Sequence, residues 1–314
     1  MISVPVLVLC SVAMAGTLWA AGVCYRRVFY NANNTQEYIY AIPPGEQYEA
    51  VSSVMLENIR RLQQMPYEQI FIKASDGKTL AGKYYHFKDH APVQILFHGY
   101  RGNGQQEYAC GNQMAKELGY NTIVVDERAH GKSAGHTISF GIKERQDCRD
   151  WAYYAANRFG HDTKLILSGV SMGAATVLMA SELALPDTVA AITADCPYSS
   201  PGAIIRKVAK DVRLPPWLIY PFVVLGALLF GHFRLWDGSP VKAVENTKIP
   251  ILLVHGEDDR FVPCDMSREI HAACKGPAML ATFPFAGHGL SYLTDTERYH
   301  AIYREFFRIC KIMH

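Results

Sequence analysis

The sequence predicts an α/β protein with a mostly parallel central sheet that helices cover on both faces. From residue 66 onward, short apolar runs of strand length alternate with longer segments of helical periodicity. This alternation is typical of parallel strands joined by crossover helices. The chain has 314 residues, 49% of them apolar, which is enough for a large core. Since α/β domains of roughly 200–250 residues often form one unit, we expect a single domain with an additional N-terminal segment.

An antiparallel hairpin begins the domain. Residues 68–74 and 79–87 alternate apolar and polar side chains around the turn-forming sequence SDGK, as hairpin strands do. Six further strands are predicted, at Val93–Phe97, Thr122–Asp126, Leu165–Gly169, Val189–Ala194, Ile251–His255 and Met279–Phe283. Helices are predicted between and after them, at Glu107–Leu118, Lys143–Arg158, Met172–Leu185, Met266–Lys275 and Tyr292–Ile309.

The N-terminus predicts a membrane anchor. No charged side chain occurs before Arg26, and residues 4–23 form an apolar stretch of the ~20 residues that cross a bilayer core. A cleaved signal peptide is the alternative, but its basic n-region is missing. We predict a transmembrane helix within residues 1–27, then a connector and an amphipathic helix over 28–65. The helix is indicated by apolar residues at three- and four-residue steps, namely Val51, Val54, Met55, Ile59 and Leu62.

Charge and cysteine content suggest where the domain lies and what it does not bind. Arg26 and Arg27 directly follow the apolar stretch, and positive residues beside a span tend to stay cytoplasmic. We therefore expect a single-pass protein of the cell membrane whose main domain faces the cytoplasm. Eight scattered cysteines agree with buried thiols in a reducing compartment. The net charge of +2, without a basic block, gives no support for a nucleic-acid partner.

Ser171 is the candidate nucleophile. It is the serine of Gly169-Val170-Ser171-Met172-Gly173, between a predicted strand and a predicted helix. In that context Gly-x-Ser-x-Gly forms a nucleophile elbow, a tight turn that exposes the serine hydroxyl above the sheet. The alternative is an ordinary helix-capping serine.

A serine hydroxyl needs a base to take its proton and an acid to orient that base. In an elbow-type site the acid and then the histidine follow the serine along the chain. His288 fits because it lies in the glycine-flanked loop FAGHGLS after the last predicted strand. Glu257, Asp258 and Asp259 follow the strand before it and are candidate acids. Asp195, after the preceding strand, is the alternative acid.

Two backbone N–H groups are expected to form an oxyanion hole for the charge that develops on the carbonyl oxygen. One would come from Met172, directly after the nucleophile. The other would come from Tyr100, in the loop that follows the strand ending at Phe97. Arg101 is interpreted as a solvent-exposed loop residue, with contact to a substrate carboxylate as the alternative. This chemistry requires no cofactor and no metal.

The ordered motifs HGYRGN, DERAHGKSAG, GVSMG, HGEDDRFVP and AGHGLSY resemble those of the α/β-hydrolase superfamily. They are most similar to bacterial membrane-anchored serine hydrolases of the prolyl-oligopeptidase-like and serine-aminopeptidase-like group. The resemblance covers about residues 66–314 and implies the α/β-hydrolase fold for this catalytic domain. It also implies that the acid is Asp259, the fifth residue of His-Gly-x-x-Asp-x-x-Val-Pro. One departure is Ala129, where relatives usually carry glycine.

Residues 197–247 occupy the usual position of a cap insertion in this superfamily. Their stretch from Leu214 to Phe233 contains no Lys, Arg, Asp or Glu. A membrane span here would place Ser171 and Asp259 on opposite sides of the bilayer, although both must reach one histidine. We therefore predict an apolar cap over the active site.

Together these features predict a serine hydrolase that cleaves acyl esters, as esterases and lipases do, through an acyl-enzyme. The substrate would be a small-molecule or lipid-like acyl compound. A serine peptidase or aminopeptidase is the alternative within the same chemistry. A non-catalytic binding protein with the α/β-hydrolase fold is the alternative from another class.

Overall fold

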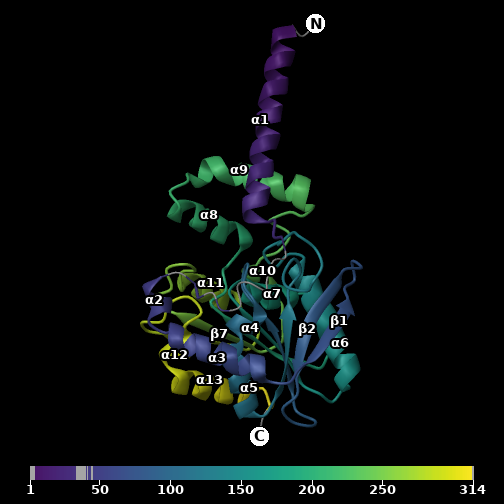
Figure 1. Ribbon diagram of the computed structural model, residues 1–314, viewed down its shortest axis with the longest axis vertical. Coiled ribbons are helices and arrows are strands. Elements are labelled where there is room, and N and C mark those ends of the chain that lie inside the picture. Colours follow the sequence, from purple (N-terminus) through teal and green to yellow (C-terminus); the bar gives the residue numbers. More distant parts are fainter. Residues whose placement is uncertain (1–3, 33–39, 41, 44, 313–314) are drawn as a thin grey trace.

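The computed structural model describes residues 4–32, 40, 42–43 and 45–312. Its centre is an eight-stranded sheet with the order β1-β2-β4-β3-β5-β6-β7-β8 (Figure 1). The pairs β1–β2 and β2–β4 are antiparallel, and the other five pairs are parallel. The predicted hairpin and the mostly parallel sheet are confirmed.

Each predicted strand appears within two residues of its expected bounds. The strands are β1 (Glu68–Lys73), β2 (Thr79–Tyr85), β3 (Val93–Phe97), β4 (Asn121–Asp126), β5 (Leu165–Val170), β6 (Val189–Asp195), β7 (Ile251–Gly256) and β8 (Ala278–Phe283). Strands β3 and β7 are buried along their whole length, as expected for strands covered on both faces.

Helices cover both faces of the sheet. Buried side chains of α6 (Glu144–Phe159), α7 (Met172–Ala180) and α11 (Asp265–Ala273) form the core on one face. Those of α5 (Ala109–Leu118) and α13 (Thr296–Ile309) pack on the other face, joined by α3 (Ser52–Gln64). Helix α3 is the amphipathic helix predicted from the sequence, and it buries Ile59 and Leu62.

Three predicted helices differ in extent from the observed ones. The segment 107–118 contains the end of α4 (Gly104–Glu107) and then α5, and the helix after Ser171 ends at Ala180 rather than at Leu185. The segment 292–309 divides into α12 (Ser291–Thr294) and α13. The division falls at Asp295, whose side chain accepts a hydrogen bond from the backbone N–H of Arg298 at 3.0 Å. An N-cap of this kind starts a new helix.

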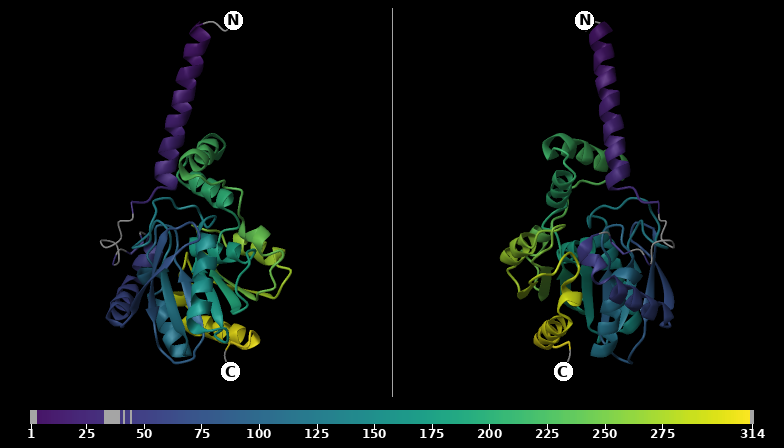
Figure 2. Two further views of the ribbon diagram at one scale, coloured as in Figure 1. Left: turned by 90° about the vertical axis from the view of Figure 1, so that its right-hand side faces the viewer. Right: turned by 60° about the vertical axis from the view of Figure 1, so that its left-hand side comes forward.

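Helix α1 (Val4–Val28) projects away from the rest of the molecule (Figures 1 and 2). Leu9, Val12 and Trp19 are exposed along it. Within the described residues, no helix combines the length and the apolar character needed to cross a membrane.

The chain that ends α1 is part of the folded core. Phe29 is fully buried and makes edge-to-face contacts with Phe140 and Phe233. The Phe29 N–H donates to the Tyr25 carbonyl, and the Ile138 N–H donates to the Phe29 carbonyl. The end of α1 is therefore fixed to the rest of the domain by a buried aromatic side chain and by backbone hydrogen bonds.

The insertion at 197–247 packs against α1. It contains α8 (Pro201–Asp211), α9 (Pro216–Gly226), the π-helix η2 (Ala227–Gly231) and α10 (Pro240–Ala243). Figure 1 shows α9 crossing α1 near its base. A Cβ atom at Gly226 would lie 2.6 Å from the backbone oxygen of Ala21, so only glycine allows the two helices to approach this closely.

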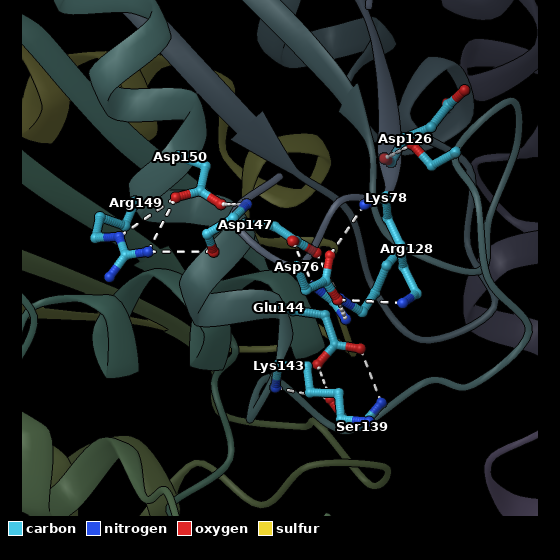
Figure 3. Close-up of polar contacts among 12 residues, drawn as sticks. Asp76, Lys78, Asp126, Arg128, Ser139, Lys143, Glu144, Asp147, Arg149 and Asp150 are labelled. Atoms are coloured by element: carbon cyan, nitrogen blue, oxygen red, sulfur yellow. Dashed lines mark hydrogen bonds and ion pairs between the residues drawn. The ribbon is translucent and has the colours of Figure 1, made fainter. Parts of the chain in front are cut away.

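A buried ion pair fixes the loop after β4 (Figure 3). Arg128 donates two hydrogen bonds to Asp147 of α6, at 2.6 and 2.5 Å, and one to Asp76 of the β1–β2 turn, at 3.1 Å. Burial by itself would lower the pKa of Arg128, but the hydrogen bonds to Asp147 outweigh it and raise the pKa above its usual range. The guanidinium therefore stays charged and joins the hairpin, the loop and α6.

Candidate active site

Ser171 lies at the sharp turn between β5 and α7. Its backbone has φ 54° and ψ −112°, a strained conformation for a residue other than glycine. A Cβ atom at Gly169 would lie 2.1 Å from the Gly173 carbonyl oxygen, and one at Gly173 would lie 1.8 Å from the Phe97 carbonyl oxygen. The two glycines are therefore required by the close approach of three backbone segments.

Ser171, His288 and Asp259 form one hydrogen-bonded line. The Nε2 atom of His288 lies 3.0 Å from Oγ of Ser171, and its Nδ1 atom lies 2.6 Å from Oδ2 of Asp259. With the proton on Nδ1, the imidazole donates to Asp259 and accepts from the serine hydroxyl. Three strand ends bring these residues together, since Ser171 follows β5, Asp259 follows β7 and His288 follows β8.

Asp259 is held as a carboxylate. Its Oδ1 atom accepts hydrogen bonds from the N–H groups of Phe261 and Val262, at 2.9 and 2.7 Å. Burial by itself would raise the pKa of Asp259, but hydrogen bonds from His255, His288 and the Val262 amide hold the pKa well below its usual range. The Nε2 atom of His255 lies 3.3 Å from Oδ2 of Asp259. His255 and Asp259 are the first and last residues of the sequence HGEDD. The signal for their contact was therefore present in that motif.

The other candidate acids have different surroundings. Glu257 and Asp258 are exposed, and Glu257 accepts a hydrogen bond from the hydroxyl of Thr282. Asp195 is buried, and its Oδ2 atom accepts a hydrogen bond from the hydroxyl of Tyr299 at 3.2 Å. Burial raises the pKa of Asp195 to about 6. Within the described residues, Asp259 is the carboxylate that is hydrogen-bonded to His288.

The two expected oxyanion donors come from the residue after Ser171 and from the loop after β3. Met172 is the first residue of α7, where a backbone N–H has no acceptor within the helix. Tyr100 follows β3 and lines the same cavity as Ser171. A Cβ atom at Gly99, next to Tyr100, would lie 3.3 Å from Cβ of Ser171, so this loop passes close to the serine.

The loop that carries Tyr100 is attached to the end of α1. The Tyr100 hydroxyl donates to the Val28 carbonyl at 2.8 Å. The Nη2 atom of Arg101 donates to the carbonyls of Arg27 and Tyr30, both at 3.0 Å. Arg101 is an exposed loop residue, as predicted, and it also binds backbone carbonyls at the end of α1.

Cys196 places a second nucleophilic side chain, a thiol, close to His288. Its Sγ atom lies 4.0 Å from Nε2 of His288, and burial raises the pKa of this thiol well above its usual range. In the described part of the chain, Cys196, Asp259 and His288 form a group whose ligand atoms could hold a metal ion, since they lie within 4.8 Å of one another. Both imidazole nitrogens of His288 already have partners in Ser171 and Asp259.

A cavity of about 670 Å³ lies beside Ser171 and His288. The loop residues Phe261 and Leu290 contribute apolar surface to it, and Phe261 contacts the His288 ring edge to face at 5.1 Å. No described residue of the insertion 197–247 lines this cavity. The lining of this cavity therefore gives no support to the expected apolar cap. The buried apolar residues of the insertion, Ile204 and Val223 among them, pack in one cluster with Met172 of α7 and with Phe29 at the end of α1.

A family model for the alpha/beta hydrolase fold matches residues 92–223 of the chain. The uncharacterized protein YqkD of Bacillus subtilis is 28% identical over 191 residues, which cover 60% of this chain and 63% of YqkD. The uncharacterized protein YfhR of Escherichia coli (strain K12) is 24% identical over 244 residues, which cover 76% of this chain and 78% of YfhR.

Two solved structures have the same fold. The Pyrococcus furiosus esterase Pf2001 matches with a TM-score of 0.64 and 23% identity, over 79% of this chain and 92% of the esterase. Est1E from Butyrivibrio proteoclasticus, solved with ferulic acid bound, matches with a TM-score of 0.57 and 22% identity, over 76% of this chain and 97% of Est1E. At these identities the similarity concerns the fold.

Proposed function

Because this chain is a member of the alpha/beta hydrolase superfamily, we propose that it is a serine esterase that cleaves acyl esters through an acyl-enzyme on Ser171. The observation that carries the proposal is the hydrogen-bonded line from Asp259 through His288 to Ser171. The esterase Pf2001 and the ferulic acid-bound protein Est1E share the fold. The apolar residues of the adjacent cavity suit an acyl chain.

In the proposed reaction, Oγ of Ser171 attacks the ester carbonyl while Nε2 of His288 takes the hydroxyl proton. The imidazolium is stabilised by the Asp259 carboxylate, whose lowered pKa keeps it charged. His288 then gives the proton to the leaving alcohol, and water hydrolyses the acyl-enzyme by the same steps in reverse. General-base assistance of this kind contributes about 10²–10⁴ in rate.

The oxyanion formed by the attack would be stabilised by the N–H groups of Tyr100 and Met172. A single donor of this kind contributes about 10²–10³ in kcat. The N-terminus of α7 adds a partial positive charge beside the same oxygen.

Ser171→Ala tests the proposal. We expect it to abolish the hydrolysis of p-nitrophenyl esters and covalent labelling by a fluorophosphonate probe, because the attacking hydroxyl is absent. Ser181→Ala, at the other end of α7, is the matched control and should keep both activities. An unchanged Ser171→Ala variant would overturn the proposal. A panel of aminoacyl anilides measured beside the esters separates an esterase from the peptidase alternative.

Cys196 provides a further check on the nucleophile. Its raised pKa keeps the thiol neutral at pH 7, and a neutral thiol is a poor nucleophile. Cys196→Ala should therefore retain fluorophosphonate labelling. If labelling persists in Ser171→Ala and disappears in the double variant Ser171→Ala, Cys196→Ala, the nucleophile is Cys196 and not Ser171.

Attachment of the enzyme to a membrane through α1 is a separate proposal. Its support is the exposure of apolar side chains along the helix, with Leu9 at 75%, Val12 at 67% and Trp19 at 73%, followed by Arg26 and Arg27 in the last turn. The protein should sediment with membranes in a buffer of low ionic strength. A variant with Leu9→Lys and Val12→Lys should shift to the supernatant. Recovery of the unmodified protein in the supernatant would overturn this proposal.

We propose that the hydrolase domain lies on the cytoplasmic side of the membrane, because Arg26 and Arg27 are in the last turn of α1 and positive residues beside a membrane segment tend to stay cytoplasmic. External protease applied to intact spheroplasts of an expressing strain should leave the domain uncut until the cells are lysed. Digestion before lysis would overturn the cytoplasmic assignment.

A further inference from the structure

The wall of the cavity that faces His288 comes from the N-terminal part of the chain. Residues Ile42, Pro43, Gln47, Tyr48 and Met55, here called the N-terminal wall, line the cavity together with Ser171 and His288. They precede the first strand of the hydrolase domain. The insertion that was expected to cover the site contributes none of its described residues to this lining.

Tyr48 is the member of the N-terminal wall that contacts the candidate base. It lies in α2 (Glu46–Glu49), and its hydroxyl donates a hydrogen bond to the backbone carbonyl of His288 at 2.9 Å. The ring is partly buried, and burial raises the pKa of Tyr48 above its usual range, so that the phenol stays protonated and can donate.

Gln47, the residue before Tyr48, lies against the same loop at Gly287. A Cβ atom at Gly287 would lie 1.7 Å from Oε1 of Gln47. The side chain of Gln47 therefore lies directly against Gly287, and a larger residue at position 287 would require the exposed Gln47 side chain to move. Two consecutive side chains of the N-terminal wall thus contact two consecutive residues of the histidine loop.

From this geometry we propose that Tyr48 is both a positioning residue for His288 and a specificity-determining residue for the size of the substrate. The hydroxyl holds the backbone of His288, and the ring closes the outer side of the cavity. This inference rests on the proposed esterase function. The two roles belong to different parts of the Tyr48 side chain, and they can be tested separately because a substitution can remove the hydroxyl and keep the ring.

Tyr48→Phe and Tyr48→Ala distinguish these roles. Tyr48→Phe should lower kcat several-fold while leaving the order of preferred substrates unchanged, because only the hydrogen bond to His288 is lost. Tyr48→Ala should raise the ratio of kcat/KM for bulky over small substrates at least tenfold, because the cavity is opened. Tyr40→Ala is the control, since Tyr40 precedes the N-terminal wall, is 50% exposed and does not line the cavity.

The ratio is measured in two series of esters. In one, p-nitrophenyl esters vary from acetate to dodecanoate. In the other, the butyrate is constant and the alcohol varies from methyl to naphthyl. The series that shifts in Tyr48→Ala identifies the half of the substrate that faces the ring.

Three results would overturn the proposal while the parent protein remains active. They are unchanged ratios in both series for Tyr48→Ala, an equal shift in Tyr48→Phe, or an equal shift in Tyr40→Ala. Failure of the proposed function is distinguishable, because the parent protein would then neither hydrolyse esters nor react with fluorophosphonate.

Discussion

The Nδ1 atom of His288 lies 2.6 Å from Oδ2 of Asp259, although 29 residues separate the two in the chain. The alternative acid, Asp195, instead accepts a hydrogen bond from Tyr299. Each carboxylate therefore has its own partner, and the two can be tested separately.

Asp259→Asn should lower kcat by about 10⁴, as loss of the orienting carboxylate does in a worked protease triad. The amide cannot stabilise the imidazolium and favours the wrong tautomer of His288. Asp258→Asn and Asp195→Asn should change kcat far less. Steady-state kinetics with one p-nitrophenyl ester compares the three variants. If Asp195→Asn is the inactive one, the assignment of the acid to Asp259 is wrong.

Asp195→Asn should instead change how stability depends on pH. The pKa of Asp195 in the folded protein is about 6, above its ordinary value of 3.8, because the group is buried. Its contribution to stability is therefore fully present below pH 3.8 and is lost as the pH rises through 6. Relative to the parent protein, Asp195→Asn should gain about 2 kcal/mol of unfolding free energy between pH 4 and pH 7.

Urea denaturation at several pH values measures this gain. Asp258→Asn, at an exposed position, is the control and should follow the parent protein across the range. A constant difference between Asp195→Asn and the parent protein would contradict the raised pKa.

Arg128→Met should destabilise the fold by about 3–5 kcal/mol, because the buried carboxylate of Asp147 is left without its charged partner. Adding Asp147→Leu should recover much of that loss, since the carboxylate that was left without a partner is then removed as well. Arg149→Met is the control, because its ion pair with Asp150 is more exposed than that of Arg128 with Asp147. Thermal or urea unfolding of the four proteins checks the order. Equal losses for Arg128→Met and Arg149→Met would show that the buried pair contributes no more than the exposed one.

Arg101→Met should lower kcat about tenfold with little change in KM, because a small displacement of a loop that carries an oxyanion donor affects the transition state more than substrate binding. The variant loses the hydrogen bonds to the carbonyls of Arg27 and Tyr30. Arg101→Lys keeps a donor at this place and should recover part of the rate. Unaltered kcat in Arg101→Met would mean that the end of α1 does not help to position the loop.

Local sequence patterns were sufficient for the strands and for the elbow. Alternating or continuous apolar residues set each strand, and the two glycines around Ser171 signal backbone contacts that no side chain could allow. The pattern was less informative for helix ends. Asp295 divides one predicted helix into two through a single side-chain hydrogen bond, which apolar periodicity does not register.

Other features depend on which distant segments meet. The contact of Tyr48 with the histidine loop joins residues 240 positions apart, and nothing in the local sequence of either partner indicates the other. The insertion 197–247 is apolar whether it packs on the active site or on α1. The composition of the insertion therefore does not distinguish these two positions. The close approach of Gly226 to Ala21 shows that the insertion contacts α1.

Local sequence was enough to predict the succession of strands and helices along the chain, the elbow at Ser171 and the loop positions of Asp259 and His288, because each depends on neighbouring residues. The tertiary structure decided that His288 contacts Asp259 rather than Asp195, that the N-terminal wall and not the insertion borders the cavity, and that the end of α1 holds the Tyr100 loop. These outcomes depend on how packed surfaces fit together in space, and the free energy of that fit is shared among segments that are far apart in the chain.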